Sequence, residues 1–145
     1  MRREPVRNVT RQGFTLVELA VVIVIIGVLA SFGVPRFLKS VERSKAAEAF
    51  NYLSAVRAAQ ERYQSMNGTY ADDATQLDIS FPTPKYFDIA APVAGGTGSI
   101  EDSWSVSLTR TGTAAGYGAY TVVFTESGFD SDNSTIPTDI NPSGS

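Results

Sequence analysis

Carboxylates are the main side chains that could do chemistry in this chain, because its 145 residues contain no cysteine and no histidine. Disulfides are therefore excluded, as are zinc sites built on cysteine or histidine and the Cys–His and Ser–His–Asp nucleophile systems. No other combination of nucleophile, base and metal ligands can be found along the sequence. We therefore expect a protein that is not an enzyme.

A group of oxygen-bearing side chains lies near the C-terminus, made of Asp130, Asp132, Asn133, Ser134 and Asp139. Oxygen ligands at this density are the kind that calcium prefers. The spacing is not that of an EF-hand, which needs a glycine at its turn and a closing glutamate. The alternative interpretation is a solvated acidic loop. We expect no resident cofactor and keep calcium at Asp130, Asp132 and Asp139 as a hypothesis.

Glu18 is the only charged residue in an apolar run of 21 residues, 14–34. A helix of this length spans roughly 30 Å, enough to cross a bilayer core. The run is too long for the apolar region of a secretory signal peptide, about 7–15 residues. A carboxylate inside such a span costs on the order of 2–3 kcal/mol and should have a partner. Alternatively, Glu18 lies at headgroup level, where the helix N-terminus favours a negative charge.

The sequence GFTLVE at residues 13–18 follows a short basic leader and opens this apolar run. Here the chain resembles the type IV pilin and type II secretion pseudopilin superfamily. The signature of that superfamily is a glycine, a phenylalanine and, four residues later, a glutamate at the start of a hydrophobic helix. Gly27 and Pro35 also match positions where many members have glycine and proline. The resemblance is close from Arg11 to about Met66.

The resemblance implies that a membrane-embedded prepilin peptidase cuts between Gly13 and Phe14, and that the new α-amine of Phe14 is methylated. The absence of a side chain at Gly13 would give the peptidase access to the backbone. It further implies that Glu18 pairs with the Phe14 amine of a neighbouring subunit and so sets the register of a filament. An inner-membrane assembly platform is the other implied partner.

Gly27 and Pro35 are weak points in the expected helix. Pro35 removes a helical hydrogen bond to residue 31, and Gly27 weakens the helix by about 1 kcal/mol. One interpretation is a simple kink. The resemblance implies more, namely that the segment between these positions loses helical structure during assembly.

The helical pattern continues beyond the apolar run, since residues 36–66 contain no glycine or proline. Apolar or small residues recur there at steps of three and four, which marks one face of an amphipathic helix; they are Ala49, Tyr52, Leu53, Val56, Ala59, Tyr63 and Met66. Asn67-Gly68 supplies a stop, because both residues tolerate the left-handed conformation at a helix C-terminus. We therefore predict one helix over residues 15–66.

The C-terminal part follows a period of two. Apolar and hydroxyl residues alternate over 103–109 and again over 119–125, which predicts a β-hairpin. We also expect a short strand at 86–89 and one helical turn at 74–77. The predicted fold class is α+β and pilin-like, with a long N-terminal helix packed on a small antiparallel sheet. The predicted domains are a cleaved leader (1–13), a transmembrane and filament-core helix (14–35), an amphipathic helix (36–67) and a β-rich head with an acidic C-terminal loop (68–145).

Charge is distributed unevenly. The leader carries four arginines against one glutamate, whereas the whole chain has a net charge of −3. The acidic remainder disfavours nucleic-acid binding. Arg36, Lys39, Arg43 and Lys45 follow the apolar run closely, so the positive-inside rule decides weakly; the concentrated leader charge favours a cytoplasmic N-terminus. We expect a single-pass inner-membrane precursor and, after assembly, an extracellular or periplasmic filament.

The function that these expectations favour is that of a structural subunit of a type IV pilus-like filament, serving adhesion, motility or surface attachment. The alternative is a pseudopilin of a type II secretion system, whose short filament drives export of folded proteins. A DNA-uptake pilin is disfavoured by the acidic head. A membrane-anchored enzyme is disfavoured by the missing catalytic groups.

Overall fold

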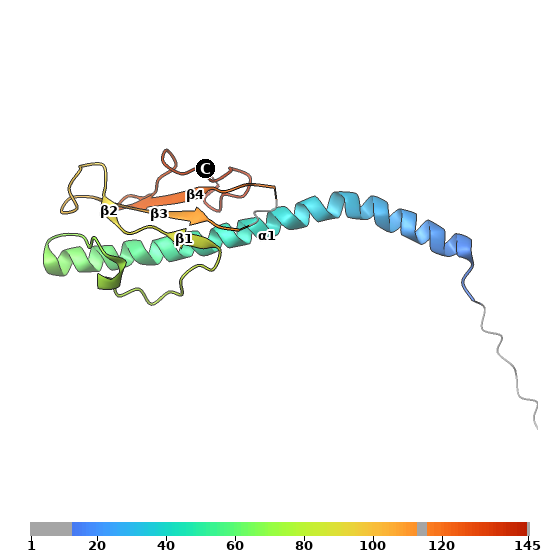
Figure 1. Ribbon diagram of the computed structural model, residues 1–145, viewed down its shortest axis with the longest axis horizontal. Coiled ribbons are helices and arrows are strands. Elements are labelled where there is room, and N and C mark those ends of the chain that lie inside the picture. Colours follow the sequence, from blue (N-terminus) through green and yellow to red (C-terminus); the bar gives the residue numbers. More distant parts are fainter. Residues whose placement is uncertain (1–12, 113–115, 145) are drawn as a thin grey trace, which may run out of the picture. The chain divides into compact units, whose positions relative to one another are not determined.

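The computed structural model describes residues 13–112 and 116–144. Its longest element is helix α1, Leu16–Asn67, of 52 residues, which confirms the single long helix predicted from the sequence (Figure 1). The chain divides into two units, Met1–Arg36 and Phe37–Ser145, with the division inside α1 just after Pro35. Apart from Gly13, the predicted leader lies outside the described residues.

The described part of the first unit consists of residues 13–15 and the beginning of α1. Every one of its side chains is exposed, including large apolar ones such as Leu19, Ile23 and Leu29. By length and composition, α1 contains one candidate membrane span near the N-terminus. Water disfavours so much exposed apolar surface, so this unit is built for a non-aqueous environment.

The second unit contains the rest of α1 and all the strands. After α1 come a short 3₁₀ helix, η1 (Ala74–Gln76), and five strands: β1 (Phe87–Ile89), β2 (Val93–Ala94), β3 (Trp104–Arg110), β4 (Thr121–Thr125) and β5 (Gly128–Phe129). The sheet is antiparallel with strand order β1-β3-β4-β5, and β2 also pairs with β3. The predicted hairpin is the β3–β4 pair, in which Val106 lies opposite Phe124 and Leu108 opposite Val122.

The core lies between the C-terminal half of α1 and one face of this sheet, as the ribbon shows (Figure 1). The helix contributes a stripe of buried apolar residues at the expected steps of three and four: Ala46, Ala49, Tyr52, Leu53, Val56 and Ala59. Alternate residues of β3 point to the same core, namely Trp104, Val106 and Leu108. The α+β fold with a long helix on a small antiparallel sheet is thus confirmed. The predicted stripe ends earlier than expected, because Met66 is exposed.

Helix α1 ends where the sequence indicates. Gly68 has φ of 77°, in the left-handed region, and its N–H donates to the Gln64 carbonyl at 2.8 Å. The Asn67 side-chain amide donates to the Tyr63 carbonyl at 3.0 Å. Both contacts satisfy carbonyls that the last turn of a helix leaves without partners.

The C-terminal segment differs from the loop expected from its composition. It begins with β5, and further on it pairs with β4 through Asp130 N–H to the Val123 carbonyl and Thr135 N–H to the Thr121 carbonyl. Ile136 and Ile140 are buried in the core. These two apolar residues anchor a segment whose acids and serines otherwise predict loop.

Candidate functional site

The cleavage motif at Gly13 and Phe14 is exposed and lies just before the start of α1. Residues 13–15 have no regular structure, and α1 begins at Leu16. Phe14 is 93% exposed, and, its chain neighbours aside, no residue that the structure describes lies within 4 Å of the position that a side chain at Gly13 would occupy. The geometry therefore leaves the Gly13–Phe14 bond accessible.

Glu18 forms a capping box with Thr15 at this helix start. The Thr15 N–H and hydroxyl donate to Glu18 Oε2 at 2.8 and 3.0 Å, and the Glu18 N–H donates to the Thr15 hydroxyl at 3.2 Å. Such reciprocal bonds satisfy N–H groups that have no partner in the first turn of a helix. Glu18 Oε1 accepts no hydrogen bond from any residue that the structure describes. One carboxylate oxygen is thus engaged within the subunit and the other is available.

Gly27 and Pro35 both lie inside α1, which is continuous through them. Nothing occupies the space that a side chain at Gly27 would fill. In the single chain, therefore, these positions interrupt neither the helix nor a packed contact. Loss of helix between them during assembly stays a prediction.

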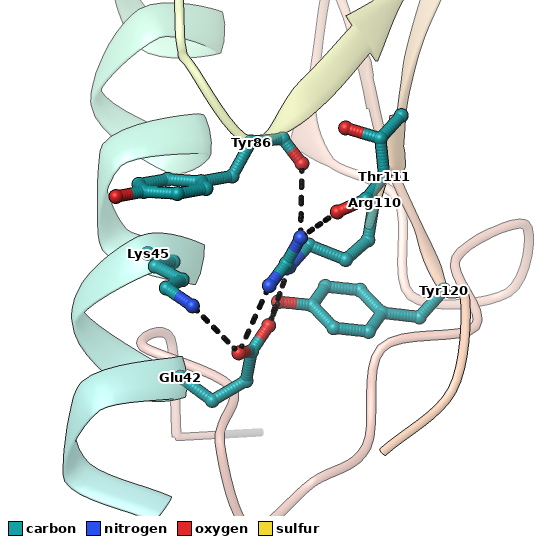
Figure 2. A network of polar contacts seen from close by, with 6 residues as sticks. All are labelled: Glu42, Lys45, Tyr86, Arg110, Thr111 and Tyr120. Atoms are coloured by element: carbon teal, nitrogen blue, oxygen red, sulfur yellow. Dashed lines mark hydrogen bonds and ion pairs between the residues drawn. The ribbon is translucent and has the colours of Figure 1, made fainter. Parts of the chain in front are cut away.

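A buried polar network joins the C-terminal half of α1 to the sheet (Figure 2). Arg110, on β3, binds Glu42 with two hydrogen bonds, from Nε to Oε1 at 2.6 Å and from Nη2 to Oε2 at 3.2 Å. The Tyr120 hydroxyl donates to Glu42 Oε1 at 3.0 Å, and Lys45 Nζ lies 3.5 Å from Oε2. Arg110 also donates to the backbone carbonyls of Tyr86 and Thr111. The side chains of Glu42 and Arg110 are almost completely buried.

This network fixes its own charge states. Burial opposes ionisation of Glu42, but the hydrogen bonds from Arg110 and Tyr120 outweigh it, so the pKa of Glu42 lies below its usual range. The hydrogen bond to Glu42 raises the pKa of Arg110, and burial beside Glu42 raises the pKa of Tyr120. The pair is therefore ionised at neutral pH, and its bidentate geometry specifies one arrangement of helix on sheet.

Sequence reasoning did not find this network, although two signals point to it. Glu42 lies four residues before Ala46 and seven before Ala49, so it continues the buried stripe of α1. Arg110 continues the inward alternation of Trp104, Val106 and Leu108. Opposite charges at inward positions of two packed elements predict an ion pair, because a buried charge needs a partner.

Two of the three aspartates considered for calcium, Asp130 and Asp139, have carboxylates that are bound by other residues. The Asp130 carboxylate accepts hydrogen bonds from the backbone N–H groups of Asp132 and Asn133 and from the Asn133 side chain, which lowers the pKa of Asp130. Asp139 accepts from the Tyr117 hydroxyl at 3.0 Å and lies 3.5 Å from Lys39 Nζ. Within the ranges 13–112 and 116–144, no group of three acidic side chains is arranged to hold a metal ion.

Calcium binding therefore stays a prediction without a preformed site in the described part of the chain. A ligand that binds only the folded state raises the melting temperature by mass action. If Asp130, Asp132 and Asp139 form a site, millimolar calcium should raise the melting temperature, with magnesium as the control cation; no shift would leave this segment as a plain acidic loop. A rise that Asp132→Asn abolishes would instead establish a calcium site at the C-terminal segment.

Comparison with known proteins agrees with the exposed motif and the long helix. Residues 9–34 match the family described as the prokaryotic N-terminal methylation motif. The fimbrial protein EcpC of Eikenella corrodens is 35% identical over 107 residues, which cover 73% of this chain and 68% of EcpC. The chain belongs to the type IV pilin and type II secretion pseudopilin superfamily, and the resemblance predicted from residues 13–18 is confirmed.

Of two further relatives, one is named a type IV pilin and the other a type II secretion system protein. The type IV major pilin protein PilA of Myxococcus xanthus is 40% identical over 73 residues, covering 50% of this chain and 33% of PilA. The type II secretion system core protein G of Vibrio cholerae is 37% identical over 73 residues, covering 49% of this chain and 50% of that protein. The chain thus matches a third to a half of these two relatives. All three relatives are named as filament or secretion-system proteins rather than as enzymes.

Proposed function

We propose that this chain is a structural subunit of a type IV pilus-like filament, which it joins through the N-terminal half of α1. The observation that carries the proposal is the exposed apolar surface of that half-helix, directly behind a prepilin motif. Exposed apolar surface on this scale marks a lipid or protein interface. The same surface serves both environments in turn, lipid before assembly and neighbouring helices after it.

Maturation is the first step of the proposed function. A prepilin peptidase in the inner membrane cuts after Gly13, and the new α-amine of Phe14 is methylated. The exposure of Phe14 and the empty surroundings of Gly13 support this step. Because the cut precedes α1, the product keeps the span and stays in the inner membrane as a single-pass precursor with its N-terminus cytoplasmic.

Assembly is the second step, and Glu18 is the residue that sets its register. A carboxylate in an apolar interface needs a partner, and the Phe14 amine of a neighbouring subunit is a cation that maturation creates. The capping box uses Glu18 Oε2 and leaves Oε1 available for that amine. The helix cap and the contact between subunits are therefore compatible. An inner-membrane assembly platform would extract the subunit, and the filament would then lie outside that membrane.

Mass spectrometry of the native protein together with electron microscopy of a deletion strain tests this proposal. We expect a mature N-terminus at methylated Phe14 and surface filaments that disappear when the gene is deleted. An intact Met1, or a cut after the apolar run, would contradict the maturation step. Cells that keep all their filaments on deletion would contradict the role as a structural subunit of those filaments.

A pseudopilin of a type II secretion system is the second candidate. The similarity to core protein G of Vibrio cholerae, and to that of Pseudomonas aeruginosa at 32% identity over 74 residues, favours it. The two candidates differ in the phenotype of the deletion strain. Loss of surface filaments supports the pilus subunit, whereas loss of exported folded proteins with filaments intact supports the pseudopilin.

A further inference from the structure

Five side chains surround α1 at the N-terminal edge of the second unit and form what we call the basic collar: Lys39, Arg43, Lys45, Tyr86 and Tyr117. All three cations are on α1, and the two tyrosines come from loops that fold back onto it. Tyr86 contacts one of these cations directly, and Tyr117 is linked to another through Asp139. Lys45 Nζ lies 4.7 Å from the centre of the Tyr86 ring, and Lys39 shares Asp139 with the Tyr117 hydroxyl.

The collar is more positive than its sequence indicates. Glu42 lies between Lys39 and Arg43, but its carboxylate is buried and already bound by Arg110 of the sheet. At the surface, Lys39 and Arg43 therefore face one carboxylate, that of Asp139, whereas Lys45 is partly buried and lies 3.5 Å from Glu42 Oε2. Lys39 and Arg43 are one helical turn apart on the same side of α1, and Arg43 is exposed without a hydrogen bond or ion pair to any residue in the described ranges.

Chain connectivity limits how far the collar can be from the apolar run. Lys39 lies five positions after Val34, and five residue steps reach at most about 18 Å even when fully extended. Headgroup and interfacial layers add roughly 5–8 Å on each side of the hydrocarbon core. The collar thus lies at or just beyond the headgroups whenever the run spans a bilayer.

We infer that the basic collar binds the headgroups of anionic phospholipids and holds the second unit against the membrane surface before assembly. Tyrosine beside lysine and arginine is the composition that membrane interfaces select, because the rings are amphipathic and the cations reach phosphate. Each exposed cation near an anionic surface strengthens membrane association by about fivefold. The inference rests on the proposed membrane residence of the chain, but it assigns a separate surface and a separate partner.

The acidic surface of a second copy is the competing partner for these cations. Lipid is favoured because the collar continues directly from the span, whereas no contact with a second copy is needed to bring headgroups within reach. The collar also contains aromatic side chains, which match an interfacial lipid layer.

The test uses the full mature chain in vesicles, with one fluorescent label at Ser44→Cys in the collar. The chain has no cysteine of its own, so the label is unique, and Ser44 is exposed. Quenching by acrylamide, a neutral molecule, is measured in phosphatidylcholine vesicles with and without phosphatidylglycerol. A label at Ser65→Cys, exposed at the far end of α1, is the positional control.

We expect phosphatidylglycerol to protect the Ser44 label several-fold and the Ser65 label not at all. K39Q/R43Q should abolish the protection, and R57Q/R62Q, which removes the same charge elsewhere on α1, should preserve it. In the unsubstituted chain, about 1 M salt should also abolish it, since the screening length then falls to about 3 Å; this arm does not depend on how the variants fold.

Protection that is independent of phosphatidylglycerol would overturn the inference. Protection that follows the density of protein in the vesicle, rather than the lipid charge, would overturn it in favour of a second copy. Flotation of the vesicles separates these results from a failure of the proposed function. A chain that does not float has no membrane residence, whereas a floating chain with an unprotected collar refutes only the collar's lipid binding.

Discussion

The two halves of α1 belong to one continuous helix, but the apolar side chains of one half are exposed and those of the other half are buried. In the first half, the large apolar side chains are all exposed, and Leu16–Val34 has no protein partner in the described chain. In the second half, apolar residues are confined to one stripe, and the sheet covers it. The first half must therefore be stabilised by lipid or by other subunits, whereas the second half is stabilised by packing against the sheet of its own chain.

Glu18 and Glu42, two of the four glutamates of α1, show the same difference in polar terms. Glu18 binds only its own helix start and keeps one oxygen available. Glu42 is buried, and both of its oxygens are bound by residues of the sheet or of α1. A carboxylate whose two oxygens are both bound within the chain stabilises the fold. A carboxylate with one oxygen still available is suited to an intermolecular contact.

Glu18→Ala should have the largest effect, and it should fall entirely on assembly. Cleavage and membrane insertion should survive, since the motif at Gly13 and Phe14 is intact and the span loses a costly carboxylate. The buried Phe14 amine would lose its partner, and removing one member of a buried pair costs about 3–5 kcal/mol. Electron microscopy and immunoblotting should show mature, membrane-resident protein with few or no filaments.

Thr15→Ala is the matched control for this variant. It removes the capping hydroxyl that contacts Glu18 but keeps the carboxylate. Filaments in Thr15→Ala but not in Glu18→Ala would assign the effect to pairing between subunits. Equal loss in both variants would assign it to the helix cap, and wild-type filaments in Glu18→Ala would refute the register role.

Glu42→Ala should have the next largest effect, and it should fall on folding. Arg110 would keep its backbone acceptors but lose its carboxylate partner while its charge stays buried, and the Tyr120 hydroxyl would lose its contact with Glu42. We therefore expect the free energy of unfolding to drop by about 3–5 kcal/mol. Urea denaturation of residues 37–145, which contain the whole core, measures this drop. The control Glu61→Ala, at an exposed position of α1, should stay within about 0.5 kcal/mol of wild type.

A variant without the buried ion pair separates the effect of the buried charge on stability from the effect of side-chain volume. Glu42→Leu, Arg110→Met and Tyr120→Phe together remove the buried ion pair and the hydroxyl bound to it, and well-packed apolar replacements of buried ion pairs are often neutral. We therefore expect this triple variant to recover most of the stability that Glu42→Ala loses. A triple variant as unstable as Glu42→Ala would show that the loss of stability comes from the changed volume of the site, rather than from a buried arginine that has lost its carboxylate partner.

How much of this could be predicted depends on how local the signal is. The long helix, its stop at Asn67-Gly68 and the β3–β4 hairpin follow from periodicity and turn residues, which act within a few positions. The pairing of Glu42 with Arg110 joins residues 68 positions apart, and periodicity within one element cannot show it. Strands β2 and β5 have two residues each, too short for an alternating pattern.

Leu53→Ala and Leu19→Ala test the comparison of the helix halves with one chemical change. Leu53 is fully buried, and a buried leucine reduced to alanine costs about 2–5 kcal/mol. Leu19 is 56% exposed and packs against nothing in the described chain, so its replacement should leave the unfolding of the second unit unchanged. Urea unfolding of the full chain in detergent, followed by the fluorescence of Trp104, measures both. Similar losses of unfolding free energy in the two variants would contradict the difference between the two halves of α1.

The pH dependence of stability should give the smallest effect, and it isolates the charge of Glu42. Because the pKa of Glu42 is lower in the folded chain than in the unfolded one, its ionisation stabilises the fold above the ordinary value of 4.5. That contribution is lost as the pH falls from 4.5 through the lowered folded pKa. Other carboxylates with lowered pKa values, such as Asp73 and Asp130, titrate in the same range. The measurement is therefore the difference in unfolding free energy between wild type and the triple variant, in which those contributions cancel.

We expect this difference to be constant at and above neutral pH, up to the titration of Tyr120, and to shift against wild type below 4.5. The shift should be smaller than the loss in Glu42→Ala, because a protonated carboxyl keeps one oxygen that still accepts from Arg110 or Tyr120. A difference that stays constant down to acid pH would mean that Glu42 is not selectively stabilised as an anion. Glu42 would then bind the helix to the sheet by hydrogen bonding alone, and the contrast with the available carboxylate of Glu18 would concern burial rather than charge.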